Sequence, residues 1–308
     1  MNNETIVVFG EALVDDFITE QVVGGAPFNV ARNLAALGAL PLMITRLGND
    51  GSGVTVSAEF GRFGMSQAGL QIDAARPTGR VVVERSAGGH RFIILPDQAY
   101  DYIEAGPALT AMAAVNPALL YFGTLAQRNP CSRDSLHQLF DACAGKTYLD
   151  LNLREGEVNE ACVFDSLHQA DIVKVNEEEV QNLFTCYLPE GAATQAIGSA
   201  DWAAACDCLM RLFTLDELIV TLGERGSVYF GANGMRITTC DIVTTAHFVD
   251  TVGAGDAFSA VFLFGRSRQW PLQLILQRAN AFAGAICGIA GAVPQDDAFY
   301  QSWIARWL

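Results

Sequence analysis

"KTYLDLNLREGEVNEACVFDSLHQADIVKVNEEEVQNLF" occupies residues 146–184 and changes its pattern three times. Residues 146–153 and 171–176 are short apolar runs that predict strands, whereas residues 160–170 and 177–184 predict helices. Continuous apolar strands that alternate with helices are typical of parallel sheets, because the connecting helices cover the sheet faces. This stretch therefore predicts an α/β fold.

The same alternation extends outward in both directions. Further strands are predicted at residues 5–13, 40–48, 118–125, 215–223 and 246–250, and further helices at 27–38, 55–64, 132–145, 200–213 and 256–265. Pro27 lies near the first position of its helix, and Gly38 follows the end of that helix. We expect a mostly parallel central sheet with helices on both faces.

Two predicted hairpins interrupt the alternation. Residues 79–95 contain two strand runs joined by "SAGG", and residues 226–240 turn around "ANG". The pattern leaves two interpretations of the first hairpin open. It either projects from the sheet as a lid or forms an antiparallel edge of the main sheet.

Composition excludes several classes of function. The chain has 308 residues, of which 51% are hydrophobic, enough for one large domain or one domain with an appendage. Its formal net charge is −15, and its only lysines are Lys146 and Lys174. Such a surface repels nucleic acid and anionic lipid, so neither is an expected partner. The Gly- and Ala-rich segment 279–293 fits a helix packed inside a globule better than a membrane span.

The cysteines and the N-terminal residues indicate the cellular compartment in which the protein is expected. The eight cysteines contain no C-x-x-C pair and therefore give no zinc framework. The first residues carry no basic region before their apolar run, unlike a signal peptide. We expect a cytoplasmic protein with reduced thiols.

Residues 250–265, "DTVGAGDAFSAVFLFG", combine features that suit phosphate chemistry. Gly253, Ala254 and Gly255 form a turn before a helix, where free backbone N–H groups bind anions. Asp256 falls in the first helical turn, where the helix dipole favours its ionised form. A carboxylate beside such an anion hole accepts a hydroxyl proton while the amides stabilise charge on a phosphoryl group. The alternative is a plain turn followed by a helix that Asp256 caps.

Two familiar phosphate-binding motifs are absent. The dinucleotide pattern G-x-G-x-x-G requires glycine where the chain has Phe258. A P-loop ending in Gly145 and Lys146 requires glycine where the chain has Phe140, and the residues after it form a predicted strand.

"DTVGAGDAF" resembles the C-terminal signature of the ribokinase-like, or PfkB, carbohydrate kinase family. "GGAPFNVARNLAALG" at 24–38 resembles its N-terminal signature, and "RLGNDGSG" resembles the segment after that. "VKVNEEEV" is similar to the N-x-x-E element, "VTLGERG" to the nucleotide-binding strand and turn, and "ANAFAGAICGIAGAVP" to the segment over the adenine. These segments occur in the family's order across nearly the whole chain.

The resemblance implies a ribokinase-like three-layer α/β/α fold with a mostly parallel sheet and a small β lid. It implies one kinase domain over residues 1–308, with lid segments at about 15–24 and 78–98. The implied activity is transfer of the ATP γ-phosphoryl group to a sugar hydroxyl. Asp256 matches the catalytic base, and the amides of Gly253, Ala254 and Gly255 match the anion hole.

For the sugar, "GEALVD" resembles fructokinases in particular. The resemblance assigns sugar contacts to Asp15, Gly25 and Asn29, in addition to Asp256. "DLNLR" at 150–154 is similar to a fructokinase element in which Arg154 reaches the sugar or the transferred phosphate. Without the resemblance, Asp15 is a turn residue, Asn29 a polar residue of a first helical turn and Arg154 an exposed arginine after a strand.

For the nucleotide, the resemblance assigns Asn176 and Glu179 to phosphate and Mg²⁺, with Glu179 acting through water. The alternative is a solvated acidic face at 177–179. Further ATP contacts are implied for Thr221, Gly223, Gly226, Gly255 and Asn280. Family members often bind K⁺ near the anion hole, and the matching positions are Asp250, Val252, Ile289 and Gly291.

The chain also departs from the fructokinase pattern. Only eight residues separate Asp15 from Gly24, which is short for a lid segment. Ribose, a nucleoside or a 2-keto-3-deoxy sugar acid therefore remain alternative acceptors. A sugar acid requires a cation, for which Arg80, Arg85 and Arg91 are candidates. A non-catalytic sugar sensor and a homodimer formed through the lid also remain open.

Overall fold

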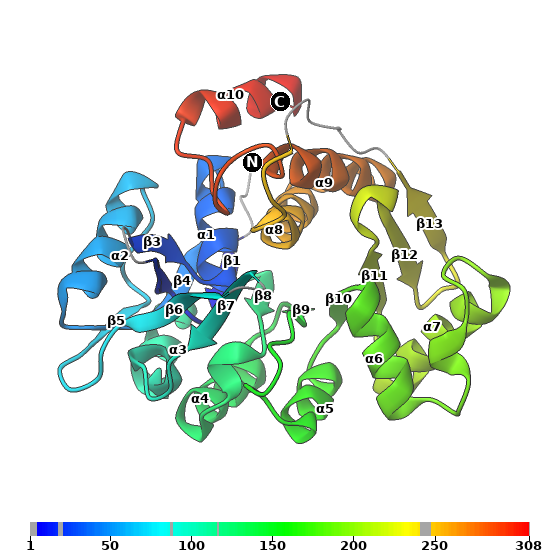
Figure 1. Cartoon of the computed structure of the whole chain (residues 1–308), viewed down its shortest axis with the longest axis horizontal. Helices are drawn as coiled ribbons and strands as arrows, with labels where there is room; N and C mark the ends of the chain where they lie inside the picture. The colour runs from blue at the N-terminus through cyan, green and yellow to red at the C-terminus, as the bar shows by residue number, and fades with distance from the viewer. Residues whose placement is uncertain (1–4, 18–20, 87–88, 116, 241–247, 308) are drawn as a thin grey trace.

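The computed structural model describes residues 5–17, 21–86, 89–115, 117–240 and 248–307. Figure 1 shows a large sheet between two layers of helices, with a small second sheet beside it. This arrangement confirms the predicted three-layer α/β/α fold with a β lid.

The main sheet has nine strands in the order β13-β12-β11-β10-β9-β8-β1-β4-β5. β12 runs antiparallel to both of its neighbours, and the other strand pairs of this sheet are parallel. The strands are β1 Ile6–Phe9, β4 Leu42–Gly48, β5 Leu70–Asp73, β8 Leu119–Phe122, β9 Lys146–Asp150, β10 Ile172–Asn176, β11 Glu217–Thr221, β12 Ser227–Gly231 and β13 Arg236–Thr239. The second predicted hairpin thus forms the antiparallel edge β12–β13.

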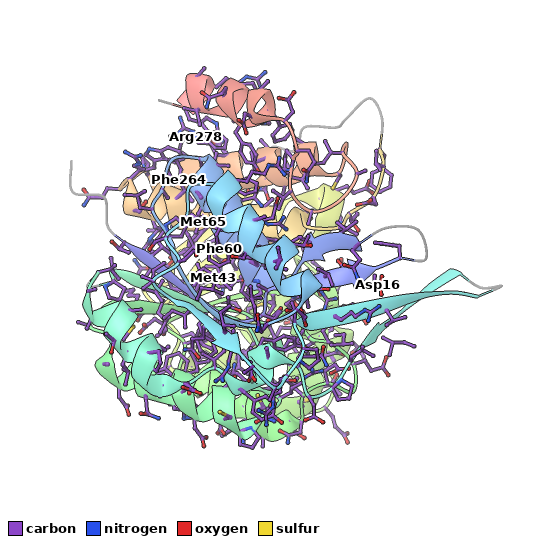
Figure 2. All side chains as sticks on the ribbon, turned by 90° about the vertical axis from the view of Figure 1, so that its left-hand side faces the viewer. Asp16, Met43, Phe60, Met65, Phe264 and Arg278 are labelled. Atoms are coloured by element: carbon purple, nitrogen blue, oxygen red, sulfur yellow. The ribbon has the colours of Figure 1, made fainter. Side chains whose placement is uncertain are left out.

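Alternating side chains of the buried strands enter two separate cores. Val7 and Phe9 of β1 pack in the core under α3–α7, whereas Ile6 and Val8 pack in the core under α1, α2, α8, α9 and α10. On this second side Phe60 of α2 joins Met43 of β4 (Figure 2). Burial on both faces explains why β1 and β8 are apolar at every position.

The predicted helices occur in the expected order, and α3 and α10 are additional helices that were not predicted. They are α1 Ala26–Ala36, α2 Gly51–Arg62, α3 Ala105–Ala113, α4 Pro130–Ala142, α5 Glu160–His168, α6 Glu177–Tyr187, α7 Ala200–Phe213, α8 Ala254–Ser267, α9 Leu272–Ile286 and α10 Asp297–Trp307. Short 3₁₀ helices are η1 Ala99–Tyr102, η2 Leu125–Gln127, η3 Ala192–Thr194 and η4 Gly223–Arg225. None of the helices in these described ranges is long and apolar enough to cross a bilayer.

The small second sheet, the lid sheet, has the order β3-β2-β6-β7. Its strands are β2 Leu13–Asp16, β3 Gln21–Gly24, β6 Gly79–Ser86 and β7 Gly89–Ile94. The first predicted hairpin is therefore part of a separate lid and not an edge of the main sheet. Figure 2 shows the lid strands extending away from the body. The "SAGG" turn falls partly on residues 87–88, outside the described residues.

Two strand predictions need correction. Residues 5–13 do not form one strand, because the chain leaves the main sheet at Gly10 and starts the lid at Leu13. Gly10 has φ +148°, and a Cβ there would lie 2.5 Å from Cγ of Pro27, so only glycine fits this change of direction. Of the strand predicted at 246–250, residues 248–250 are not in a strand, and 246–247 lie outside the described residues.

Two helix predictions also differ from the structure. α2 begins at Gly51 and not at residue 55, because Oδ1 of Asp50 caps it by accepting from N–H of Gly53 at 2.7 Å. The segment 279–293 is helical only to Ile286, within α9. The helix predicted at 200–213 and the helix start at Pro27 agree with α7 and with the proline in the first turn of α1.

Candidate active site

One large cleft, of about 1870 Å³, lies where the strands of the main sheet end. Glu11 comes after β1, Asn152 comes after β9, and Asn176 and Thr221 end β10 and β11. These positions lie at the carboxyl edge of the parallel strands, where ligands bind in open α/β sheets. The lid sheet contributes Leu13, Asp15, Val81, Ile93 and Ile94 to the opposite wall.

The cleft brings together most of the predicted site residues. Its lining includes Asp15, Gly25, Asn29, Arg154, Asn176, Glu179, Thr221, Gly223, Gly226, Val252, Gly253, Ala254, Gly255, Asp256 and Asn280. Three of the predicted K⁺ positions, Asp250, Ile289 and Gly291, are not among the lining residues.

The Gly-Ala-Gly turn opens the start of α8 toward the cleft. Gly253 is the N-cap with φ +76°, and a Cβ there would lie 2.4 Å from Cα of Ala292. N–H of Ala254 donates to the carbonyl of Thr251 at 3.2 Å. Among the described residues, the amides of Gly255 and Asp256 have no acceptor. These two amides, more than that of Ala254, are available to an anion.

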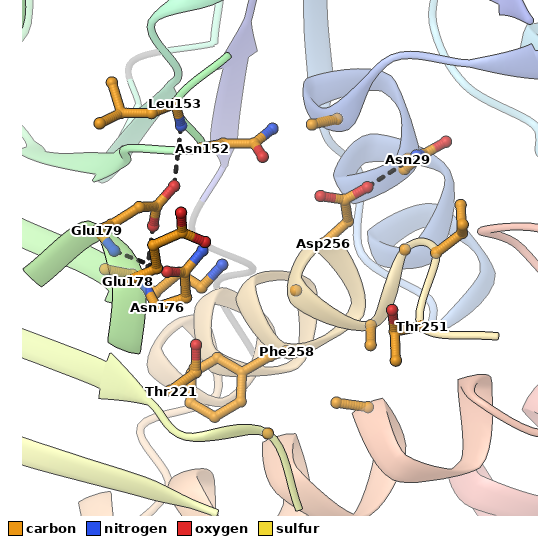
Figure 3. A pocket seen from close by; sticks show the side chains of 18 of the residues that line it. Asn29, Asn152, Leu153, Asn176, Glu178, Glu179, Thr221, Thr251, Asp256 and Phe258 are labelled. Atoms are coloured by element: carbon orange, nitrogen blue, oxygen red, sulfur yellow. Dashed lines mark hydrogen bonds between the residues drawn. The ribbon is translucent and has the colours of Figure 1, made fainter. Parts of the chain in front are cut away.

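Asp256 does not cap the helix that it begins. Its Oδ2 accepts a hydrogen bond of 2.7 Å from Nδ2 of Asn29 on α1, drawn in Figure 3. No other hydrogen bond to this carboxylate occurs within the described ranges, so Oδ1 remains open to a ligand. Desolvation raises the pKa of Asp256 to about 6, against the opposing effect of the Asn29 bond. The carboxylate is therefore a stronger base than an exposed aspartate and still ionised at pH 7.

Two more carboxyl groups lie on the lid side of the cleft. Burial raises the pKa of Asp15 to about 6, although Arg154 and Arg32 lower it. Burial also raises the pKa of Glu11 to about 7. Glu11 is only 3% exposed, and its Oε2 has no hydrogen-bond partner in the described part of the chain. A Cβ at Gly24 would lie 2.6 Å from Oδ2 of Asp15, so this glycine makes room for the acid.

Lys174 lies directly beside the turn. It is 6% exposed, and its Nζ lies 3.0 Å from Oδ1 and 3.2 Å from Oδ2 of Asp150 on the neighbouring strand. Oγ of Ser259 on α8 donates to the same carboxylate at 2.8 Å. A Cβ at Gly255 would lie 3.0 Å from Nζ of Lys174. Burial opposes the charge on Lys174, but Asp150 more than offsets it, so the pKa is raised and the lysine stays charged.

The N-x-x-E element forms a capping box at the start of α6. Oδ1 of Asn176 accepts from N–H of Glu179 at 2.9 Å, and Oε2 of Glu179 accepts from N–H of Asn176 at 2.8 Å. Oε1 of Glu179 accepts from N–H of Leu153 at 2.8 Å (Figure 3). Glu179 is 5% exposed, so the alternative of a solvated acidic face is wrong for this residue. It links α6 to the loop that carries Arg154.

The side of the cleft that is predicted to hold the nucleotide is shaped by turns and a buried amide. Gly226 has φ +87°, and a Cβ there would lie 1.9 Å from the carbonyl oxygen of Thr239, so the turn after β11 requires glycine. Nδ2 of Asn280 donates to Oγ1 of Thr239. Oγ1 of Thr221 donates to the carbonyl of Val175 at 3.3 Å.

The predicted K⁺ positions come from two adjacent loops. N–H of Val249 donates to the carbonyl of Cys287 at 2.8 Å, which joins the segment before α8 to the segment after α9. Oδ1 of Asp250 accepts from N–H of Val252 at 2.8 Å and so shapes its own turn. In the described residues, no group of three or more His, Cys, Asp or Glu side chains is arranged to hold a metal ion.

The charge of the lining bears on any bound phosphate. Among the lining residues that the structure describes, two are cationic, Arg154 and Lys174, whereas nine are acidic: Glu11, Asp15, Glu155, Glu157, Glu177, Glu178, Glu179, Glu224 and Asp256. A bare polyphosphate is repelled by such a wall. The donor set therefore fits a nucleotide that arrives with a divalent cation, because oxygen ligands and retained water suit Mg²⁺. Glu179, whose two oxygens already accept backbone N–H groups, would act on such an ion through water.

Several lining residues were not predicted from the sequence. Lys174 and Glu11 carry the chemistry most relevant to the site, and Phe248, Thr251 and Phe258 add contact surface. A lysine inside the apolar run of β10 was itself a signal, because a buried ammonium requires an acidic partner. Glu11 had no comparable local signal.

The model of the pfkB family of carbohydrate kinases matches residues 4–297. The chain belongs to this family. It is accordingly an ATP-dependent kinase that phosphorylates a sugar hydroxyl with the help of a divalent metal ion. Fructokinase-1 of Oryza sativa subsp. japonica is 30% identical over 95% of this chain and 94% of its own.

Solved structures show the same fold. A double-mutant fructokinase from Vibrio cholerae, bound to fructose, ADP and a potassium ion, has a TM-score of 0.77 at 24% identity over 98% of both chains. Aminoimidazole riboside kinase from Salmonella enterica, complexed with aminoimidazole riboside and an ATP analogue, has a TM-score of 0.75 at 23% identity. That match covers 97% of this chain and 99% of the other.

Proposed function

We propose that this sugar kinase phosphorylates fructose, with Asp256 as the general base and the amides at the start of α8 as the anion hole. The observation that carries the proposal is the geometry of Asp256. Its Oδ2 is held by Asn29, while its Oδ1 remains open at the helix end where free N–H groups accumulate. The 30% identity to the rice fructokinase supports fructose as the acceptor.

In the proposed reaction, Oδ1 of Asp256 accepts the proton of a sugar hydroxyl. The hydroxyl oxygen then forms a bond to the γ-phosphorus of ATP, and the bond from that phosphorus to the β–γ bridging oxygen breaks. ADP leaves with the electron pair of the broken bond. The amides of Gly253, Gly255 and Asp256 stabilise the charge on the transferring group, and Lys174 and Arg154 supply the positive charge nearby.

Cations complete the proposed site. Mg²⁺ neutralises the phosphate charge when bound, and Asn176 and Glu179 are the residues that would hold it, Glu179 through water. We further propose that K⁺ binds to carbonyl groups of Asp250, Val252, Ile289 and Gly291. The adjacency of these two loops supports this assignment.

The walls of the cleft favour a neutral acceptor over an anionic one. The excess of acidic lining residues repels a sugar acid or a sugar phosphate. Of the three arginines considered for a sugar acid, Arg80 pairs with Asp16 and is not a lining residue. The side chains of Arg85 and Arg91 lie outside the described set. The lid contributes the apolar Leu13, Val81, Ile93 and Ile94, which fit the carbon face of a sugar.

We also propose that residues 1–308 act as one kinase domain in which the segments at about 15–24 and 78–98 cover the acceptor. β3 and β7 form the edges of the lid sheet and offer unpaired backbone groups to a second copy. On this basis we propose a homodimer through the lid. Sedimentation that shows only monomer at working concentrations would exclude it.

The test of the proposed function is a coupled assay of ADP release over a panel of acceptors. The panel contains fructose, ribose, a purine nucleoside, 2-keto-3-deoxygluconate and fructose 6-phosphate, each with and without K⁺ at constant ionic strength. We expect the highest kcat/KM with fructose, at least ten-fold above both anionic acceptors, and higher rates with K⁺. A preference for an acceptor that carries a negative charge would contradict the electrostatic argument.

A further inference from the structure

A continuous chain of hydrogen bonds reaches Asp256 from a buried arginine. NH1 of Arg32 donates to Oε2 of Glu59 on α2 at 2.9 Å, and NH2 of Arg32 donates to Oδ1 of Asn29 at 2.6 Å. Nδ2 of Asn29 then donates to Oδ2 of Asp256 at 2.7 Å. Neither Arg32 nor Glu59 was assigned a role from the sequence.

These hydrogen bonds fix which way the amide of Asn29 faces. A guanidinium group has only donors, so the atom of Asn29 that meets Arg32 must be the carbonyl oxygen. The amino group of Asn29 is then left to face Asp256, where it donates to a carboxylate. Rotation of the amide by half a turn would place an N–H₂ group against Arg32 and an oxygen against Asp256, and both contacts would be repulsive.

Arg32 is itself held on several sides. It is 2% exposed, and its NH2 also donates to the carbonyl of Val23 in the lid strand β3 at 2.9 Å. Its guanidinium lies 5.0 Å from the ring centre of Phe28. The planar fork of an arginine allows it to bind Glu59, Val23 and Asn29 at once, which the point charge of a lysine cannot do.

We propose that Arg32 is a positioning residue for the base: it orients Asn29 so that Asp256 is kept ionised and aimed at the acceptor. This inference rests on the proposed function, because it takes Asp256 to be the base. Arg32 acts through Asn29 and contacts neither the acceptor nor the nucleotide in this assignment.

Other charged groups also face Asp256 and set the background. They are Lys174 on β10, Asp150 on β9, Glu11 after β1 and Arg154 after β9. Burial raises the pKa of Asp256, and the Asn29 hydrogen bond is the strongest opposing influence. Loss of the orientation of Asn29 therefore raises this pKa further. Arg32 also lowers the pKa of Asp15, so an assay of activity alone would mix the two acids.

The test is a titration that requires no turnover. The protein is labelled with ¹³C at aspartate carboxyl groups, and the signal lost in Asp256→Asn identifies Asp256. The variants are Arg32→Met, Asn29→Leu and the double variant of these two. Arg32→Met/Glu59→Met serves as a second form, because replacing both members of a buried ion pair with apolar groups preserves folding better than removing one.

Arg62→Met is the matched control. Arg62 also binds Glu59, with NH1 at 3.4 Å from Oε1, but it has no hydrogen bond to Asn29 among the described contacts. The substitution Arg62→Met removes an arginine from the same carboxylate and leaves the hydrogen bonds from Arg32 through Asn29 to Asp256 intact.

We expect the pKa of Asp256 to rise by roughly one unit in Arg32→Met and in Arg32→Met/Glu59→Met, and to stay unchanged in Arg62→Met. The pKa of Asp256 in the double variant of Arg32 and Asn29 should equal that in Asn29→Leu alone, because both substitutions act through the same hydrogen bond from Asn29 to Asp256. The acid limb of the pH profile of kcat/KM should move by the same amount. The loss of kcat/KM in Arg32→Met relative to wild type should shrink once the pH exceeds the pKa of Asp256 in both proteins.

Three outcomes separate the two hypotheses. An unchanged Asp256 titration in folded Arg32→Met overturns the positioning role, as do additive shifts in the double variant. A shifted titration in a protein that phosphorylates no sugar supports the positioning role and rejects only the proposed function.

Discussion

Of the helices that begin at the cleft, α6 and α8 each carry an acid at the third position. In α6 the N-cap is Asn176, and Glu179 folds back to accept from its backbone N–H, so the helix end is closed by its own residues. In α8 the N-cap is Gly253, which has no side chain, and Asp256 turns away to Asn29. The same position in a first turn is therefore used in opposite ways.

The difference separates a structural helix end from the helix end that we propose to be reactive. α6 satisfies the amides of Asn176 and Glu179 with its own side chains and gains stability. α8 leaves the amides of Gly255 and Asp256 without partners in the described structure and keeps its acid partly desolvated, which is unfavourable until a ligand binds. Substitutions at these two ends, and at the carboxyl group nearest to them, test the difference.

The largest effect is expected for Asp256→Asn. The variant keeps the shape of the side chain but removes the proposed base, so kcat should fall by roughly 10³-fold. Binding of ATP and sugar, measured by calorimetry, should change by only a few-fold. Turnover near the wild-type rate would show that the open end of α8 is no more reactive than the closed end of α6.

Gly253→Ala should damage both stability and activity. The new Cβ would meet Cα of Ala292 at 2.4 Å, and φ +76° strains any residue other than glycine. We expect a loss of about 2 kcal/mol in the free energy of unfolding, measured by urea denaturation, together with reduced kcat.

Gly61→Ala is the matched control for that change. Gly61 lies inside α2, and a Cβ there would have nothing within 4 Å. This variant should gain about 0.5–1 kcal/mol from helix propensity and keep its activity. Equal changes in the free energy of unfolding and in kcat for Gly253→Ala and Gly61→Ala would contradict the steric argument for the Gly-Ala-Gly turn.

Asn176→Ala tests the closed end. Loss of this N-cap should cost about 1 kcal/mol of unfolding free energy and raise KM for ATP, because Asn176 lines the part of the cleft that we propose to hold ATP. Asn159→Ala is the control, since Asn159 caps α5 in the same way by accepting from N–H of Cys162 at 2.9 Å but does not line the cleft. Both variants should lose similar stability, and only the first should change KM.

The smallest effect concerns Glu11 and pH. The folded state raises the pKa of Glu11 from 4.5 to about 7, so the wild type loses stability as the pH rises from about 4.5 to about 7. Glu11→Gln removes that loss. It should be more stable than wild type by about 1 kcal/mol at pH 8, since the amide must also be buried there, and no more stable at pH 4. Thermal unfolding at both pH values checks this, and an equal gain at pH 4 would exclude ionisation as the cause.

The fold was largely predictable because its signal is repetitive. Apolar runs between helices indicate a parallel sheet, and Pro27 and Gly38 mark the ends of α1. The lid strands β2 and β3 were harder, because each has four residues and mixed polarity. The strand predicted at 246–250 was wrong over its described part, where the apolar Phe248 lines the cleft and is not part of a sheet.

The site was predictable where its chemistry is local. Gly253, Gly255 and Asp256 lie within four positions, so one turn indicates all three. The support behind Asp256 was not predictable, because Arg32 and Glu59 are 27 positions apart and Asn29 and Asp256 are 227 apart. No periodic pattern records contacts between elements that meet only in the folded chain.

The acidic lining also affects product release. In the proposed reaction a neutral sugar enters this cleft and leaves with a phosphate of nearly two negative charges. The acidic lining therefore binds the sugar phosphate more weakly than the neutral sugar, so affinity falls once the phosphoryl group has been transferred. Product inhibition by the sugar phosphate should accordingly be weak and should strengthen as added salt screens the wall.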